Sequence, residues 1–161
     1  MLFRSQSDSY VESGLQLGGM YYVIGMYEEA VGVYLSVLER HPDDGRVLYR
    51  LADTYRYWGK LDRSETVFKQ MIEKDPYNAG LYTELGKLYR NMNRYEDAEI
   101  AFLNTLELDP DNDRTYSWGL GYLYTEMKRY DEAEVMFKKA LEINPGSEMA
   151  YMGLADLYRW L

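Results

Sequence analysis

Residues 85–102, LGKLYRNMNRYEDAEIAF, are nearly repeated by residues 120–137, LGYLYTEMKRYDEAEVMF. Ten of the eighteen positions are identical, with Leu, Gly, Leu and Tyr at the front and Ala, Glu and Phe behind. Self-similarity of this kind is the signature of repeat architectures, so the period of the repeat decides how the rest of the chain is interpreted.

The prolines mark that period. They are spaced by 34, 34 and 35 residues, at Pro42, Pro76, Pro110 and Pro145. This spacing divides one predicted domain, residues 1–161, into a short N-terminal extension over 1–10, repeats over 11–44, 45–78, 79–113 and 114–147, and a half repeat over 148–161. We place the extra residue of the third spacing in the Asp-Asn-Asp turn at 111–113.

Apolar and small residues recur at helical spacing within each repeat. When proline is counted as position 32, positions 4, 7, 8 and 11 follow one helix face, and positions 20, 24 and 27 follow another. Position 8 is always Gly or Ala, position 11 is always Tyr, and position 24 is always Tyr or Phe. The pattern predicts two antiparallel helices per repeat, with Gly86 (position 8) meeting Ala98 (position 20) where the third pair crosses.

The ends of the predicted helices carry their own signals. Gly25, Gly59 and Asn93 fit the left-handed residue that ends a first helix, while Lys128 holds this place in the fourth repeat at some expected loss of stability. The Ser9-x-x-Glu12 spacing predicts a capping box that opens the first helix. One helix pair cannot bury its apolar face alone, so the pairs must stack on one another.

This set of positions resembles the tetratricopeptide repeat (TPR) over residues 11–161. The pentatricopeptide repeat, an RNA-binding helical pair of similar length, is disfavoured by proline at position 32, small residues at position 8 and a net charge of −9. The resemblance implies an all-α fold, a right-handed superhelical solenoid of four helix pairs plus one terminal helix.

Composition narrows the classes of function. The 27 acidic and 18 basic residues disfavour nucleic acid and anionic membranes as partners, and the absence of cysteine excludes thiolate chemistry. No apolar run approaches the roughly 20 residues of a membrane span, and no signal-peptide core opens the chain, so we expect a cytoplasmic protein. The one histidine, His41, fits a turn residue before Pro42, so we expect no metal, no cofactor and no enzymatic activity.

The resemblance implies that the first helices line a concave groove. In the second and third repeats, five basic residues and two acidic residues hold the groove positions. Arginine and aromatic residues are common at binding hot spots, so the predicted guest is a protein or peptide segment that bears a carboxylate and an apolar side chain. The candidate groove residues are Gln16, Tyr22, Arg46, Tyr49, Arg50, Asp53, Arg56, Tyr57, Thr83, Glu84, Lys87, Arg90, Trp118 and Tyr122.

We expect Arg50, Arg56, Lys87 and Arg90 to form one basic strip along the groove. The alternative is that Asp53 and Glu84 neutralise the strip from within. The carboxylate clamp by which some relatives bind chaperone C-termini needs Lys and Asn at positions that this chain does not fill with them, so a chaperone co-factor role is not predicted.

The last half repeat supports a second class of function. Residues 148–161, EMAYMGLADLYRWL, form a first helix without its second helix. We expect Tyr151, Leu154 and Tyr158 to pack on the preceding repeat. The alternative function is a structural scaffold that associates end to end, for example as a homodimer, through the remaining apolar residues, Leu157, Trp160 and Leu161.

Overall fold

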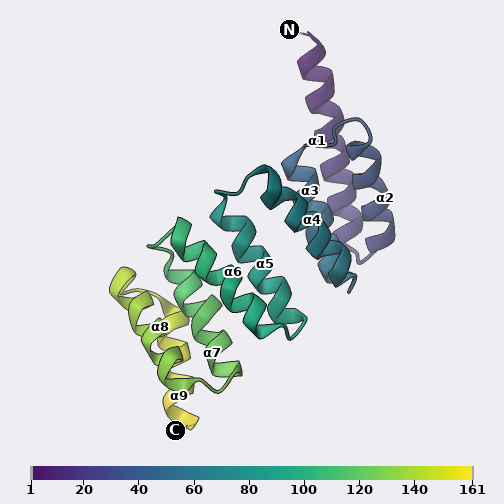
Figure 1. Cartoon of the computed structure of the whole chain (residues 1–161). Helices are drawn as coiled ribbons and strands as arrows, with labels where there is room; N and C mark the ends of the chain where they lie inside the picture. The colour runs from purple at the N-terminus through teal and green to yellow at the C-terminus, as the bar shows by residue number, and fades with distance from the viewer. Residues whose placement is uncertain (1, 161) are drawn as a thin grey trace. The chain divides into compact units, whose positions relative to one another are not determined.

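The computed structural model describes the backbone of residues 2–160 and the side chains of residues 8–159, and this part of the chain is helical with no strand (Figure 1). The helices form two compact units, residues 1–76 and 77–161. Unit 1 contains α1 (Leu2–Val23), α2 (Tyr27–Leu38), α3 (Gly45–Tyr57) and α4 (Leu61–Lys74). Unit 2 contains α5 (Ala79–Asn91), α6 (Tyr95–Leu108), η1 (Thr115–Gly121), α7 (Tyr122–Glu126), α8 (Tyr130–Ile143) and α9 (Glu148–Trp160).

Consecutive helices pack in pairs, as the two apolar faces of each repeat predict. α1 packs with α2 and α3 with α4, and α5 packs with α6. In the fourth repeat η1 and α7 together form the first helix, and both contact α8. The all-α repeat fold expected from the sequence is therefore confirmed.

The small residue at position 8 makes room for the aromatic residue at position 24. A Cβ atom on Gly86 would lie 2.7 Å from the Phe102 ring, and one on Gly121 would lie 2.5 Å from the Phe137 ring. Gly86 thus leaves no room for a side chain beside Phe102, as expected where the third pair crosses, and its contact with Ala98 stays a prediction. Ala98 is itself fully buried in the core of the same pair.

The predicted left-handed residues are present at all four helix ends. Gly25 has φ +79° and Gly59 has φ +77°, while Asn93 and Lys128 adopt φ +58° and +61°. The predicted capping box is wrong, because α1 already begins at Leu2 and continues through Ser9. Within this helix the Ser13 hydroxyl donates a hydrogen bond to the Ser9 carbonyl oxygen (2.8 Å).

The extra residue of the fourth repeat lies inside the helix and not in the preceding turn. Helical conformation begins three residues after the proline in both cases, at Asp113 after Pro110 and at Ala79 after Pro76. Residues 115–121 then form a π-helix, η1, whose wider turns absorb one additional residue. The placement of the extra residue at 111–113 was therefore wrong.

The register of the fourth repeat changes with this correction. Thr115-Tyr116-Ser117-Trp118-Gly119-Leu120 matches Ala150-Tyr151-Met152-Gly153-Leu154 of the last repeat once Ser117 is left out. Both glycines in this alignment face an aromatic ring of the preceding repeat: a Cβ on Gly119 would lie 3.1 Å from Phe102, and one on Gly153 would lie 2.2 Å from Phe137. Ser117 is the inserted residue.

Candidate functional site

A hollow of about 970 Å³ lies between α1 and α3 in unit 1, and we call it the α1–α3 hollow. Its apolar wall comes from α1 and the residue that follows it, and includes Leu15, Met20, Val23 and Ile24. Polar residues of α3, among them Arg50 and Asp53, form the opposite side. Of the predicted groove residues, Gln16, Tyr22 and Arg46 also line this hollow.

Asp53 organises the polar side of the hollow. Its carboxylate pairs with Arg56 and accepts a hydrogen bond from the Tyr22 hydroxyl at 3.4 Å. Burial, together with the charge of Asp53, raises the pKa of Tyr22, so the phenol stays protonated at neutral pH. The Arg56 guanidinium also lies 4.9 Å from the centre of the Tyr57 ring. Arg56 is therefore compensated within its own helix.

The other two arginines of α3 differ in their partners. Arg46 forms an ion pair with Asp44 (2.8 Å), and this hydrogen bond is the main reason that the pKa of Asp44 falls below its usual value. Asp44 in turn accepts from the backbone amides at the start of α3. Arg50 is exposed, and within the described residues no carboxylate lies at ion-pair distance from it.

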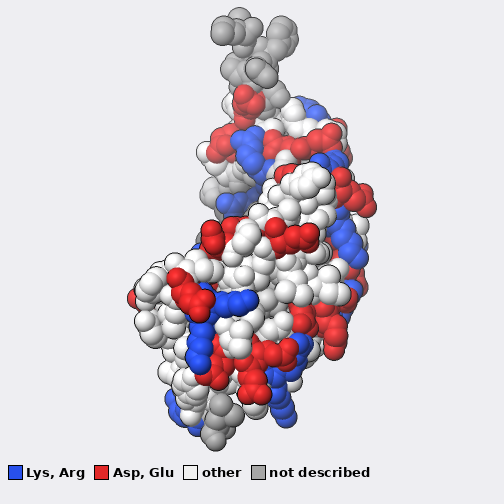
Figure 2. Space-filling model, turned by 60° about the vertical axis from the view of Figure 1, so that its left-hand side comes forward, with Lys and Arg blue, Asp and Glu red and all other residues white. Residues whose placement is uncertain are grey.

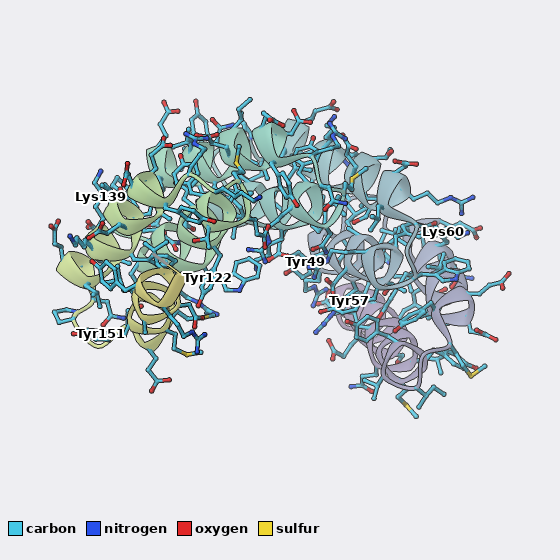
Figure 3. The ribbon with its side chains drawn as sticks, turned by 90° about the horizontal axis from the view of Figure 1, so that it is seen from below. Tyr49, Tyr57, Lys60, Tyr122, Lys139 and Tyr151 are labelled. Atoms are coloured by element: carbon cyan, nitrogen blue, oxygen red, sulfur yellow. The ribbon has the colours of Figure 1, made fainter. Side chains whose placement is uncertain are left out.

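Two of the predicted aromatic residues of unit 1 contact neighbouring rings. Tyr57 meets Tyr22 edge to face, with ring centres 5.5 Å apart, and Tyr49 meets Phe68 in the same way at 6.1 Å. Figure 3 shows Tyr49 and Tyr57 on the first-helix side of this unit.

In unit 2, Glu84 and Lys87 of α5 form an ion pair of 2.7 Å, and Glu84 is buried. Arg90, one turn further along α5, stacks on Trp118 of η1 with its Cζ atom 3.9 Å from the ring centre. Its Nη1 donates to the Trp118 carbonyl oxygen at 3.0 Å. Burial lowers the pKa of the Arg90 guanidinium, which nevertheless remains charged at neutral pH.

Tyr122 and Thr83, the remaining predicted groove residues of unit 2, have different surroundings from each other. Tyr122 is half-buried and meets the Phe137 ring edge to face at 5.4 Å, on the first-helix side of the unit, with Lys139 on the opposite side (Figure 3). Thr83 is directed at α6, where its hydroxyl shares a hydrogen bond of 3.2 Å with Thr105. Thr83 therefore contributes to the contact between the two helices of its pair.

The four residues of the predicted strip thus fall into two classes. Arg56 and Lys87 are compensated by Asp53 and Glu84, the two acidic residues that the sequence marks as internal counter-charges. Arg50 in unit 1 and Arg90 in unit 2 have no carboxylate at ion-pair distance among the described side chains. On the face seen in Figure 2, described acidic and basic side chains are interspersed.

The expectations for the last helix need correction. Leu157 is only 1% exposed, so its assignment to a self-association surface is wrong, whereas Tyr151 and Tyr158 are 56% and 53% exposed. A first helix rests on the preceding second helix through the stripe that contains Leu157, and α8 contacts α9 in this way. The Tyr158 hydroxyl nevertheless donates a hydrogen bond to the Glu134 carboxylate of α8, so Tyr158 contacts the preceding repeat as expected. The side chains of Trp160 and Leu161 lie outside the described residues.

Within the described range, no helix is long and apolar enough to span a membrane. The described His, Asp and Glu side chains also form no group of three or more that could hold a metal ion.

The comparisons with known families agree with the helix pairs and their small-residue contacts. The tetratricopeptide repeat matches residues 21–79 and, in a second variant, residues 77–146. The chain belongs to the tetratricopeptide repeat family. Members of this family are generally non-catalytic modules of protein–protein interaction. No curated protein matches the chain.

Solved tetratricopeptide repeat structures share the fold. MamA is 22% identical with a TM-score of 0.75, over 94% of this chain and 82% of MamA. PilF of Pseudomonas aeruginosa is 24% identical with a TM-score of 0.78, over 96% of this chain and 70% of PilF. The first TPR domain of Spaghetti (RPAP3), bound to the HSP90 peptide SRMEEVD, is 23% identical with a TM-score of 0.63, over 70% of this chain and 89% of that domain.

Proposed function

We propose that this protein is a non-enzymatic interaction module that binds a partner peptide on its first helices. The observation that carries the proposal is the α1–α3 hollow, which combines an apolar wall with the uncompensated guanidinium of Arg50. A peptide that carries a carboxylate next to a large apolar side chain can bury the side chain against Met20 and Ile24 and place the carboxylate on Arg50. Desolvation by the apolar wall strengthens that ion pair.

The RPAP3 domain gives this proposal further support. The peptide bound to that domain, SRMEEVD, contains two glutamates and an aspartate, so a related fold accepts an acidic peptide. The present chain lacks the clamp residues of the chaperone-binding relatives, so we assign the same class of ligand to other side chains. We propose Arg50 as the main anion contact of unit 1.

Titration with fluorescently labelled peptides tests the proposed function. An acidic peptide with one phenylalanine is compared with a version in which glutamine replaces the acids and with a basic version. We expect the acidic peptide to bind best and Arg50→Ala to weaken it about tenfold, because a partly desolvated charge pair is lost. The matched control is Arg63→Ala, which removes an exposed arginine from α4 of the same unit. Equal affinity for acidic and basic peptides contradicts the proposal.

A second candidate function is self-association, and the exposed face of α1 favours it. We call Leu17, Met20 and Ile24 the α1 stripe; their side chains are 46%, 68% and 67% exposed. In the second repeat the equivalents of the first two, Leu51 and Thr54, are buried, and α2 packs on that helix. We propose the α1 stripe, in place of Leu157, as the surface through which two copies associate.

A further inference from the structure

The π-helix of the fourth repeat lies directly beside the uncompensated arginine of unit 2. Insertion of Ser117 widens the helix at the residue that precedes Trp118. π-helical turns are rare and occur frequently at functional sites. Here the wider helix presents both the ring and the peptide carbonyl of Trp118 to Arg90 of α5. The two parts of the cluster come from neighbouring first helices within one compact unit.

These two contacts hold the Arg90 guanidinium in a fixed position. The Trp118 ring covers one face of the plane at 3.9 Å, and the carbonyl oxygen takes one hydrogen of Nη1. Nε and Nη2 have no acceptor among the described residues, and neither is a buried unsatisfied atom. One edge of the guanidinium therefore offers two parallel N–H donors, the arrangement that pairs with a carboxylate in a fork.

Among the described charges around Arg90, none forms a direct ion pair with its guanidinium. Lys87, whose ammonium lies 5.4 Å from the centre of the same ring, is already paired with Glu84. Glu126 acts on Arg90 electrostatically but forms no ion pair with it. A partly buried cation without a hydrogen-bonded carboxylate is unfavourable, and an incoming anion of single charge relieves this cost.

We propose that Arg90, stacked on Trp118, is a preformed receptor for a single carboxylate. The site is built for a planar monoanion, because one uncompensated guanidinium suits a carboxylate better than the double charge of a phosphate. The carboxylate comes either from a peptide C-terminus or from an Asp or Glu side chain. The inference rests on the proposed function, since it assigns a second anchor for the same class of peptide.

The fluorescence of Trp118 reports on this site directly. In a Trp58→Phe/Trp160→Phe background, Trp118 is the one tryptophan of the chain. We titrate this protein with the acetylated peptide Ala-Ala-Phe-Ala as the free acid, with its C-terminal amide, and with an amide that contains an internal Glu. The free acid should give a saturable change in emission, while the plain amide gives none. Binding of the Glu amide identifies a side-chain carboxylate as a source, and its failure to bind identifies the C-terminus.

Substitutions of Arg90 then distinguish binding through its two parallel N–H donors from binding through its positive charge alone. Arg90→Ala should weaken the free acid about tenfold or more, and Arg90→Lys should weaken it nearly as much, because an ammonium keeps the charge but not the two parallel donors. Lys139→Ala is the control: it removes a cation that lies 5.6 Å from the centre of the Tyr116 ring in the same unit. Circular dichroism confirms that each variant is folded.

Three results overturn the inference: Arg90→Ala binds as the parent does, a phosphoserine peptide binds more tightly than the free acid, or no carboxylate changes the emission of Trp118. The two substitutions distinguish a failure of this inference from a failure of the proposed function. If Arg50→Ala weakens labelled acidic peptides while Arg90→Ala has no effect on either assay, the proposed function stands and the Trp118 site does not. If no acidic peptide binds in either assay, both fall.

Discussion

Left-handed residues end the first helix of the four complete repeats, and Lys128 is the one with the bulkiest side chain. Glycine reaches a positive φ freely, and asparagine tolerates it, whereas a lysine side chain crowds its own backbone there. The sequence was sufficient to predict these positions, because each lies between two helical stripes at the same place in the period. The left-handed residue that ends the first helix therefore recurs at the same position of each complete repeat, as the helices themselves do.

Lys128→Gly should stabilise the protein by about 1 kcal/mol, because the strain of φ +61° disappears at an exposed position. The midpoint of urea unfolding measures the change. Asn93→Gly is the matched control and should give a smaller gain. A Lys128→Gly variant that unfolds at the parent midpoint argues against strain at this position.

Ala98→Leu should destabilise the protein by roughly 1–3 kcal/mol, because the residue is fully buried and the larger side chain overpacks the third pair. Thermal melts followed by circular dichroism give the effect. Ile100→Ala, at a 59% exposed position of the same helix, should be close to neutral. Equal melting of the Ala98→Leu variant and the parent would show that this helix contact is loosely packed.

At the scale of the element, the position of the extra residue in the fourth repeat could not be predicted from the proline spacing. The proline spacing revealed one extra residue, and the usual place for an insertion is a loop. The structure keeps the turn at its normal length because the turn positions the helix for stacking, and the insertion appears as the π-helix η1. The near match of residues 115–120 to residues 150–154 was the available signal, since Ser117 breaks it.

Deletion of Ser117 should convert η1 into an ordinary α-helix and restore the 34-residue spacing. We expect the deletion variant to melt at or above the parent temperature, because α-helical turns have better hydrogen-bond geometry than π-helical ones. The same variant should lose the emission response of Trp118 to the free-acid peptide, because the ring no longer lies under Arg90. If the deletion variant is less stable than the parent and its Trp118 emission still responds to the free-acid peptide, the π-helix is not required for the site.

At the scale of the whole molecule, exposed apolar surface matters as much as the interior of the helix pairs. The side chains of Leu17, Met20 and Ile24 on and after α1 are apolar and exposed, and such surface favours association. Residues 13–27 form the longest run of the chain without a charged residue. Two copies of an acidic protein therefore meet less repulsion between like charges along this run than along the charged helices.

Sedimentation velocity over a wide range of concentration tests this association. Three large side chains form a smaller surface than the roughly 800 Å² that each partner of a stable complex usually buries, so we expect a weak, concentration-dependent dimer. Met20→Glu/Ile24→Glu should abolish it, while Tyr151→Glu at the other end should leave it intact. A protein that stays monomeric at all concentrations, or a dimer that only Tyr151→Glu disrupts, contradicts the assignment to α1.

The candidate site could be predicted in part. Residue types and repeat positions identified the arginines and tyrosines of the first helices, and they offered Asp53 and Glu84 as internal counter-charges only as the alternative to a basic strip. Periodicity alone could not show which arginines remain uncompensated, because ion pairs depend on how each side chain folds back on its own helix. The stack of Arg90 on Trp118 was also hidden, since it depends on the π-helix and joins residues 28 positions apart.

The most direct test of the central claim, that a carboxylate-bearing peptide binds on the first helices, is an NMR titration of the isotope-labelled protein. We predict that an acidic peptide with one phenylalanine shifts the resonances of the α1–α3 hollow, including the side-chain Nε–H of Arg50, and that the α4 and α8 amides stay unchanged. The glutamine version of the peptide should leave the Arg50 resonance where it is. Shifts confined to α2, α4, α6 and α8, or equal shifts with both peptides, would contradict the account.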